Sequence, residues 1–181
     1  MGAGLSGLAC AITLEQNGIK PVIFENRSKV GDRFVNCEIL LSALSRPIND
    51  AIKYFSENHE IYLKPQSNIN KLVIHSPHHT AIISGALGYT NLRGRIKNSF
   101  GKQLEQQVKS KINFNSKESY EDLLHEYTHV IMATGDAAYA NKITDYDIQL
   151  TVKLKGANIK GSFDINRIDA WLNSPGNFTT A

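Results

Sequence analysis

The sequence of 181 residues predicts an α/β fold, in which a mostly parallel sheet is followed by the beginning of an antiparallel one. Three observations lead to this prediction. A glycine-rich turn at residues 2–7 is followed by an apolar helical pattern and then by a short apolar strand at 21–24. A second apolar strand, at 130–133, ends in a Thr-Gly pair. Apolar residues alternate at 148–154, which is typical of a strand buried on one face.

The glycines of the turn are Gly2, Gly4 and Gly7, and they have the spacing G-x-G-x-x-G. In a dinucleotide-binding turn, Gly2 would allow the tight bend between strand and helix, Gly4 would let the backbone approach a pyrophosphate, and Gly7 would let the helix pack closely on the sheet. The N–H groups at the helix start and the helix dipole would then hold the phosphates. The candidate cofactor-binding residues of this turn are Gly2, Ala3, Gly4, Leu5, Ser6 and Gly7.

The segment after the turn is predicted to be a helix that packs on the sheet. Apolar residues recur at helical spacing from Leu5 to Leu14, and Asn17-Gly18 is a typical helix stop. Residues 20–25 form the next strand, which ends in Glu25. A carboxylate about 20 residues after the glycines can accept hydrogen bonds from the hydroxyl groups of a ribose. The same carboxylate would repel a 2′-phosphate, so NADP is disfavoured at this site.

Charge and composition exclude several classes of protein. The net charge is +3 and the basic residues are scattered, so no nucleic-acid surface is expected. No apolar run reaches membrane-spanning length and no signal peptide opens the sequence; contact with a membrane surface and the oligomeric state stay open. Cys10 and Cys37 lack the spacing of metal ligands. Two unpaired thiols favour a reduced, cytoplasmic setting.

Residues 26–33 extend the nucleotide-binding pattern. Asn26 directly follows the acidic residue, and Gly31 and Arg33 take positions of the E-x5-G-G-R continuation found in flavoproteins, with Asp32 in place of the second glycine. Arg33 would place a guanidinium near the pyrophosphate. With the glycine turn, these residues resemble an FAD-binding Rossmann domain more than an NAD-binding one, and Asn26 and Arg33 join the candidate cofactor ligands.

The strand at 130–133 and the turn after it resemble the Ala-Thr-Gly motif that closes the FAD-binding domain of flavoproteins. Taken together, these motifs resemble the geranylgeranyl reductase-like branch of FAD-dependent oxidoreductases. The resemblance implies that Ala133, Thr134 and Gly135 approach FAD. It further implies hydride transfer between the flavin and a small organic substrate, with NAD(P)H as an electron partner. No catalytic residue is assigned.

The domain organisation follows from the same resemblance. Residues 1–140 are expected to form the FAD-binding domain, and 141–181 the start of a substrate domain with strands at 148–154 and 158–163. Only Met1 precedes the glycine turn, where a Rossmann unit has its first strand, so the sequence is expected to be a fragment cut at both ends. The other predicted elements are a helix or irregular helix at 38–58, strands at 71–75 and 80–84, a glycine-bearing loop or edge segment at 85–95, a helix capped by Ser99 at 99–111, a strand at 112–115, and a helical turn or polar connection at 120–126.

Two alternatives stay open. One is a nucleotide-binding fragment without catalytic activity. The other is a zinc hydrolase, because His125, Glu126 and His129 match H-E-x-x-H. That motif needs one helix through both histidines, whereas β-branched residues begin at Thr128, so the zinc interpretation is disfavoured. The histidines at 78–79 lie in a predicted hairpin turn and are interpreted as exposed polar residues.

Overall fold

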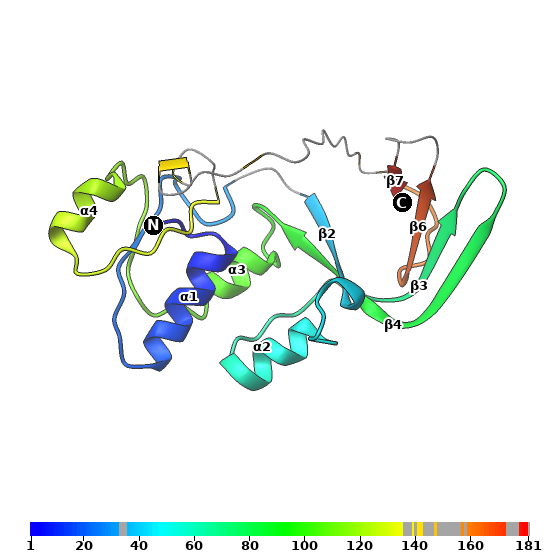
Figure 1. Ribbon diagram of the computed structural model, residues 1–181, viewed down its shortest axis with the longest axis horizontal. Helices are drawn as coiled ribbons and strands as arrows, with labels where there is room; N and C mark the ends of the chain where they lie inside the picture. The colour runs from blue at the N-terminus through cyan, green and yellow to red at the C-terminus, as the bar shows by residue number, and fades with distance from the viewer. Residues whose placement is uncertain are drawn as a thin grey trace.

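A computed structural model describes residues 1–32, 36–135, 139, 141–142, 147, 157 and 159–172, and the backbone of 178–180. The helices and strands, in chain order, are α1 (Leu5–Gln16), β1 (Ile23–Phe24), β2 (Asn36–Leu41), the 3-10 helix η1 (Ser42–Leu44), α2 (Ala51–His59), β3 (Ser67–His75), β4 (Thr80–Arg93), α3 (Phe100–Glu105), β5 (Ile112–Asn113), α4 (Tyr120–Glu126), β6 (Arg167–Leu172) and β7 (Phe178–Thr180). Figure 1 shows α1, α3 and α4 at one end of the molecule and β6 and β7 at the other.

The N-terminal part is Rossmann-like. Strand β1 pairs in parallel with β5. The extended segment 1–3 lies beside β1, because the Gly2 N–H donates to the Phe24 carbonyl over 2.8 Å. On its other side the Met1 nitrogen donates to the Ile131 carbonyl over 2.7 Å, and the Ala133 N–H donates to the Met1 carbonyl over 2.8 Å. Residues 130–133, predicted to be a strand, are not assigned to one in the structure, but their end lies directly beside the glycine turn.

A small apolar core holds α1 and α3 against this part. It is built from side chains of both helices, of β1 and of the loops between them, all at most 5 % exposed. Its buried members are Ala3, Leu8, Ala11, Ile12, Ile23, Val30, Ile61 and Leu104. The predicted helix after the glycines is confirmed as α1. It ends at Gln16, where the Asn17 N–H donates to the Thr13 and Leu14 carbonyls.

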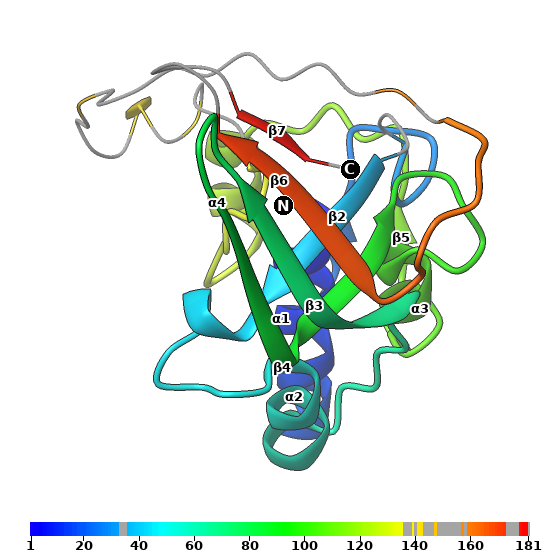
Figure 2. The same ribbon diagram turned by 90° about the vertical axis from the view of Figure 1, so that its right-hand side faces the viewer.

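The main sheet differs from the prediction. Its strand order is β2-β4-β3-β6-β7, and every pair is antiparallel except β3 with β6. The predicted mostly parallel sheet is therefore wrong: the α/β class holds, but the main sheet is a mixed, mostly antiparallel half-barrel. Figure 2 shows the strands crossing in front of α1. The cause is the hairpin of β3 and β4, whose 14-residue second strand is long enough to pair with both β2 and β3.

Two predicted elements are corrected by this sheet. Residues 36–41 form β2, so 38–41 are not part of the helix predicted at 38–58. Strand β4 runs through Arg93, where a loop or edge segment was predicted from residue 85. In this antiparallel ladder Gly88 pairs with Leu41. Its φ is +147°, and a Cβ atom there would overlap the Leu40 carbonyl. A glycine there lets the backbones approach closely, and the pairing over six residues decides the strand state of β2.

The helix starts follow capping rules. The Ser99 hydroxyl accepts from the Lys102 N–H, which confirms the predicted cap, although α3 ends at Glu105 rather than at 111. Helix α4 begins with a full capping box between Ser119 and Asp122. Helix α2 is capped by Asp50, whose carboxylate also accepts from the Tyr89 hydroxyl of β4 over 2.7 Å.

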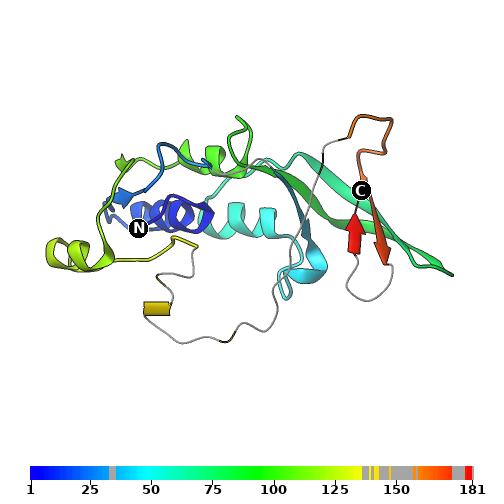
Figure 3. The same cartoon turned by 90° about the horizontal axis from the view of Figure 1, so that it is seen from above.

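The C-terminal part adds β6 and β7 to the hairpin, as Figure 3 shows at the end away from the helices. The predicted strand at 148–154 lies outside the described residues, and residues 159–163 contain no strand. The domain boundary near residue 140 stays a prediction. Among the described residues, no helix has the length and apolar character needed to cross a bilayer.

Candidate dinucleotide-binding site

The glycine turn is held in place by backbone contacts that exclude side chains. Gly2 has φ +94°, and a Cβ atom there would come within 2.5 Å of the Ala133 carbonyl oxygen. A Cβ atom at Gly7 would overlap the carbonyl oxygen of Gly2. Gly4 is different, because the nearest atom to its Cβ position is the Ala133 oxygen at 4.0 Å. The chain therefore requires Gly2 and Gly7 for its own packing, whereas the space in front of Gly4 is open.

The start of α1 is suited to an anion. Gly4 is its N-cap residue and supplies no side-chain cap, so no side chain of that residue competes for the first N–H groups of this 12-residue helix. Such N–H groups, together with the positive end of the helix dipole, are a ready site for phosphate oxygens. The open space at Gly4 and the uncapped helix start fit the pyrophosphate of a dinucleotide.

Glu25 connects the glycine turn to the loop after β1. One carboxylate oxygen accepts from the Ala3 N–H over 2.7 Å, and the other accepts from the Arg27 N–H over 2.9 Å. The sequence predicted a ribose ligand here, and the structure adds a second role in holding the turn. Each oxygen keeps lone pairs that can accept from a hydroxyl group.

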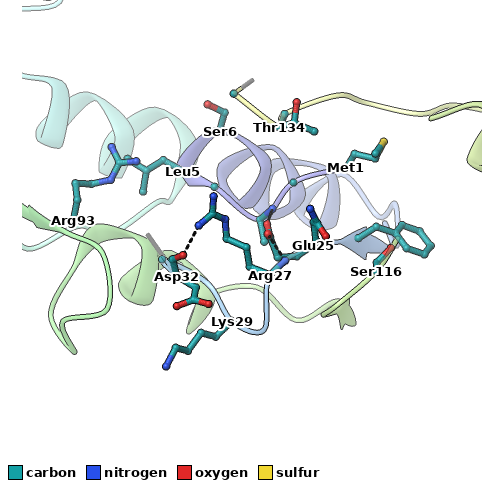
Figure 4. Close-up of a pocket in the computed structure, with 18 of the residues that line it drawn as sticks. Met1, Leu5, Ser6, Glu25, Arg27, Lys29, Asp32, Arg93, Ser116 and Thr134 are labelled. Carbon is teal, nitrogen blue, oxygen red and sulfur yellow. Dashed lines mark hydrogen bonds between the residues drawn. The ribbon is translucent and has the colours of Figure 1, made fainter. Parts of the chain in front are cut away.

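A cavity of about 680 Å³ lies in front of these groups, as Figure 4 shows. Its volume is in the range of small-molecule and cofactor sites. The predicted residues that line it are Gly2, Ala3, Gly4, Leu5, Ser6, Glu25, Asn26, Ala133, Thr134 and Gly135. Gly7 lies behind the turn, and Arg33 lies outside the described residues. That these residues bind a cofactor remains a prediction.

Sequence reasoning missed part of the cavity wall. Residues 27–32 follow Glu25 directly, so their proximity to the site could have been inferred. Glu38, Arg93 and Ser116 come from three other elements or loops, and only the fold brings them here. The additional lining residues include Arg27, Lys29, Asp32, Asn36, Glu38, Arg93, Ser116, Lys117 and Glu118.

The loop under the cavity is fixed to the end of β4. Gly31 has φ +70°, and a Cβ atom there would lie 2.5 Å from the Gly94 carbonyl oxygen. Beside it, the Arg95 guanidinium lies 2.7 Å from the Asp32 carboxylate. Desolvation raises the pKa of Asp32, but the Ser28 hydroxyl and the Arg95 charge outweigh it and hold that pKa below its usual range. Asp32 is therefore an anion that anchors the loop.

The histidine motifs do not assemble into one site. Helix α4 ends at Glu126 and Tyr127 is already extended, so His125 and His129 do not share a helical face. The histidines at 78–79 lie in the exposed turn between β3 and β4. Within the described ranges, no three His, Cys, Asp or Glu side chains cluster closely enough to hold a metal ion.

Comparison with known proteins agrees with the geometry of the turn. Residues 1–38 match the NAD(P)-binding Rossmann-like domain. The N-terminal segment is Rossmann-like. Segments of this kind bind NAD(P) or FAD and are common in oxidoreductases. A comparison of the whole chain with curated proteins finds no match.

Proposed function

We propose that the cavity binds the ADP half of FAD and that the chain is part of a flavin-dependent oxidoreductase of the geranylgeranyl reductase-like kind. The observation that carries this proposal is the meeting of three features at one cavity. These are the open backbone at Gly4, the Glu25 carboxylate, and the Ala-Thr-Gly segment at 133–135. Each was predicted from a separate stretch of sequence.

The three features divide the ADP half between them. The pyrophosphate lies at the first turn of α1, where the Ser6 N–H and its neighbours can donate to it. The adenosine ribose lies at Glu25, whose negative charge accepts from two hydroxyl groups and disfavours a 2′-phosphate. The segment at 133–135 borders the cavity on the side of Met1.

FAD is preferred over NAD because the chain contains both a continuation similar to E-x5-G-G-R and the Ala-Thr-Gly turn. NAD is the second candidate, since the domain that matches residues 1–38 is NAD(P)-binding. When bound, FAD would supply hydride transfer to or from an organic substrate, with NAD(P)H as electron partner. In this proposal the residues that line the cavity bind and orient the nucleotide, and the flavin supplies the redox chemistry.

The test is a binding measurement on the full 181-residue chain. The protein is purified with FAD, desalted, and analysed for flavin released on denaturation; the same protein is titrated with NAD⁺ and NADP⁺. Stoichiometric flavin supports the proposal. If the folded protein retains no flavin and binds NAD⁺ instead, the FAD assignment is wrong, and if it binds neither, the cavity is not a dinucleotide site.

A Gly4→Ala variant sharpens this test. The added methyl group meets only the Ala133 oxygen at 4.0 Å, so the fold tolerates it, but the methyl group occupies the space of the pyrophosphate. We expect FAD affinity to fall at least tenfold, whereas stability falls by about 0.5–1 kcal/mol from the poorer N-cap. Asp50→Ala is the matched control, because it removes the cap of α2 outside the cavity and should leave FAD affinity unchanged.

A further inference from the structure

Two oppositely charged side chains, Arg93 and Glu38, line the cavity at the far end from Ser116. Figure 4 shows Arg93 and Ser116 at opposite ends of the cavity, with Leu5 and Glu25 between them. Glu38 comes from β2 and Arg93 from β4, and Glu38 is paired in register with Asn91. Arg93 is therefore the diagonal neighbour of Glu38 on the same face of the sheet.

The pair leaves hydrogen-bonding capacity for a ligand. Arg93 donates from one nitrogen, Nη1, to both oxygens of Glu38, over 2.8 and 3.0 Å. Both side chains are 34 % exposed. Within the described part of the chain, neither has a further hydrogen-bond partner. The guanidinium has three N–H groups on its other two nitrogens and the carboxylate has further lone pairs, so a donor and an acceptor stand side by side.

The neighbouring Asn91 is a buried polar residue with an unsatisfied hydrogen-bond acceptor. The side chain is 1 % exposed, and its Oδ1 atom has no hydrogen-bond partner among the described residues. An unpaired buried acceptor costs folding free energy, so such an atom calls for an explanation. It lies on the same sheet face as Arg93 and Glu38, because Asn91 is the register partner of Glu38.

The Arg93–Glu38 pair lies where the second half of a bound dinucleotide would be placed. A ligand with its adenosine ribose at Glu25 and its pyrophosphate at the first turn of α1 continues past Leu5 toward Arg93. We propose that Arg93 and Glu38 bind the planar amide edge of the second heterocycle, the one beyond the pyrophosphate. This inference rests on the proposed function, because it takes the ADP half to lie as described above.

The chemistry of the pair selects an amide edge. Its net charge is zero, and Glu38 would repel a further phosphate or carboxylate. A carbonyl oxygen beside an N–H group matches it: Arg93 donates to the oxygen and Glu38 accepts from the nitrogen. This edge is present in the carboxamide of nicotinamide and in the pyrimidine ring of a flavin. The two sources have the same chemistry and are separated by the choice of ligand.

The experiment compares ADP-ribose, NAD⁺ and FAD on the full chain. ADP-ribose has the ribose and the pyrophosphate but no second heterocycle. We expect FAD or NAD⁺ to bind at least tenfold more tightly than ADP-ribose, and the dinucleotide with this advantage identifies the source. In Arg93→Met and in Glu38→Met, that dinucleotide should lose about tenfold in affinity, while ADP-ribose changes less than twofold.

Two further variants separate recognition from folding. The double variant Glu38→Arg with Arg93→Glu keeps an ion pair between β2 and β4, so its melting temperature should stay unchanged and a change in its heterocycle advantage reports on recognition rather than on folding. Lys102→Met is the matched control, because the Lys102–Glu105 pair on α3 is similarly exposed at 25 and 27 % and lies outside the cavity. It should change no affinity.

The outcomes distinguish this inference from the proposed function. If neither ADP-ribose nor a dinucleotide binds the folded wild-type protein, the proposed function fails. If ADP-ribose binds as tightly as both dinucleotides, or if the Arg93 and Glu38 variants weaken all ligands equally, the proposed function survives and the assignment of this pair is overturned.

Discussion

Glu25 holds the glycine turn and is also the proposed ligand of the adenosine ribose. Its two oxygens already accept the N–H groups of Ala3 and Arg27, so it orders the turn before any ligand arrives. A ribose that adds its hydroxyl groups to the same carboxylate finds the acceptor in place. The ordering cost is then met during folding rather than during binding.

Replacing Glu25 should therefore affect both processes. In Glu25→Ala we expect FAD affinity to fall by about 10- to 100-fold, since a hydrogen bond to a charged group is worth about 1.5–3 kcal/mol. Unfolding should also become easier, because the Ala3 N–H loses its acceptor. Flavin retention after desalting and chemical denaturation measure the two effects. Unchanged flavin content would show that the ribose lies elsewhere.

The sequence predicts the geometry of the glycine turn because its signals are local, while the binding role of these residues stays a prediction. Gly2, Gly4, Gly7 and Glu25 lie within one βαβ-type unit, where the chain spacing itself sets the geometry. Arg93 could not be predicted in the same way. Its place at the cavity depends on the register of β4 with β2, which is a tertiary contact.

Strand β2 shows the limit of prediction at the scale of an element. Its apolar residues 39–41 form a run too short to distinguish a strand from a helix by period. Pairing with β4 along the six residues from Asn36 to Leu41 settles the state, and that partner comes about 50 residues later. The hairpin at 71–84, by contrast, was predicted from β-rich runs on both sides of a turn and is confirmed.

The close pairing of β2 with β4 depends on Gly88. We expect Gly88→Ala to destabilise the protein by more than about 2 kcal/mol, because the new Cβ atom overlaps the Leu40 carbonyl and the ladder must shift. Chemical denaturation gives the free energy of unfolding. Gly85→Ala is the control: its φ of +143° is nearly the same as the +147° of Gly88, but its Cβ position has no atom within 4 Å. Equal losses in the two variants would assign the effect to backbone strain alone.

At the end of the sheet away from the helices, side chains of β3 and β6 form a cluster beside the backbone pairing of the two strands. Asp169 of β6 bonds His75 of β3 over 2.7 Å and also bonds Arg167, while His75 stacks on Trp171 with ring centroids 4.9 Å apart. The hydrogen bond from Arg167 holds the pKa of Asp169 below its usual range; desolvation opposes this effect and His75 adds to it. This cluster reinforces the backbone pairing of β6 with β3.

The lowered pKa of Asp169 gives the attachment of β6 a pH dependence. A carboxyl group with a depressed pKa in the folded state stabilises the fold above its unfolded pKa, and this contribution is lost as the pH falls through the folded value. We expect Asp169→Asn to speed hydrogen exchange in 71–75 and 167–172 about tenfold at pH 7. Residues 1–32 should not change.

At strongly acidic pH the wild-type protein and the Asp169→Asn variant should exchange at similar rates. The wild-type Asp169 carboxyl group is then protonated in both the folded and the unfolded state, so it is uncharged like the asparagine amide. Hydrogen exchange followed by mass spectrometry resolves these segments. A difference that persists undiminished in acid would show that packing, rather than the charge of Asp169, holds β6 to β3.

The parallel pairing of β3 with β6 also bears on the order in which parts of the chain fold. His75 and Asp169 are 94 residues apart in the chain, whereas β3 and β4 are joined by a short turn. Contacts between residues that are distant in the chain form late, because the entropy cost of closing a long loop comes before the contact can stabilise the fold. As the chain leaves the ribosome, the glycine turn, its helix and the hairpin have all emerged before β6 has been made. The cavity proposed to bind a nucleotide can therefore assemble before β6 joins the sheet.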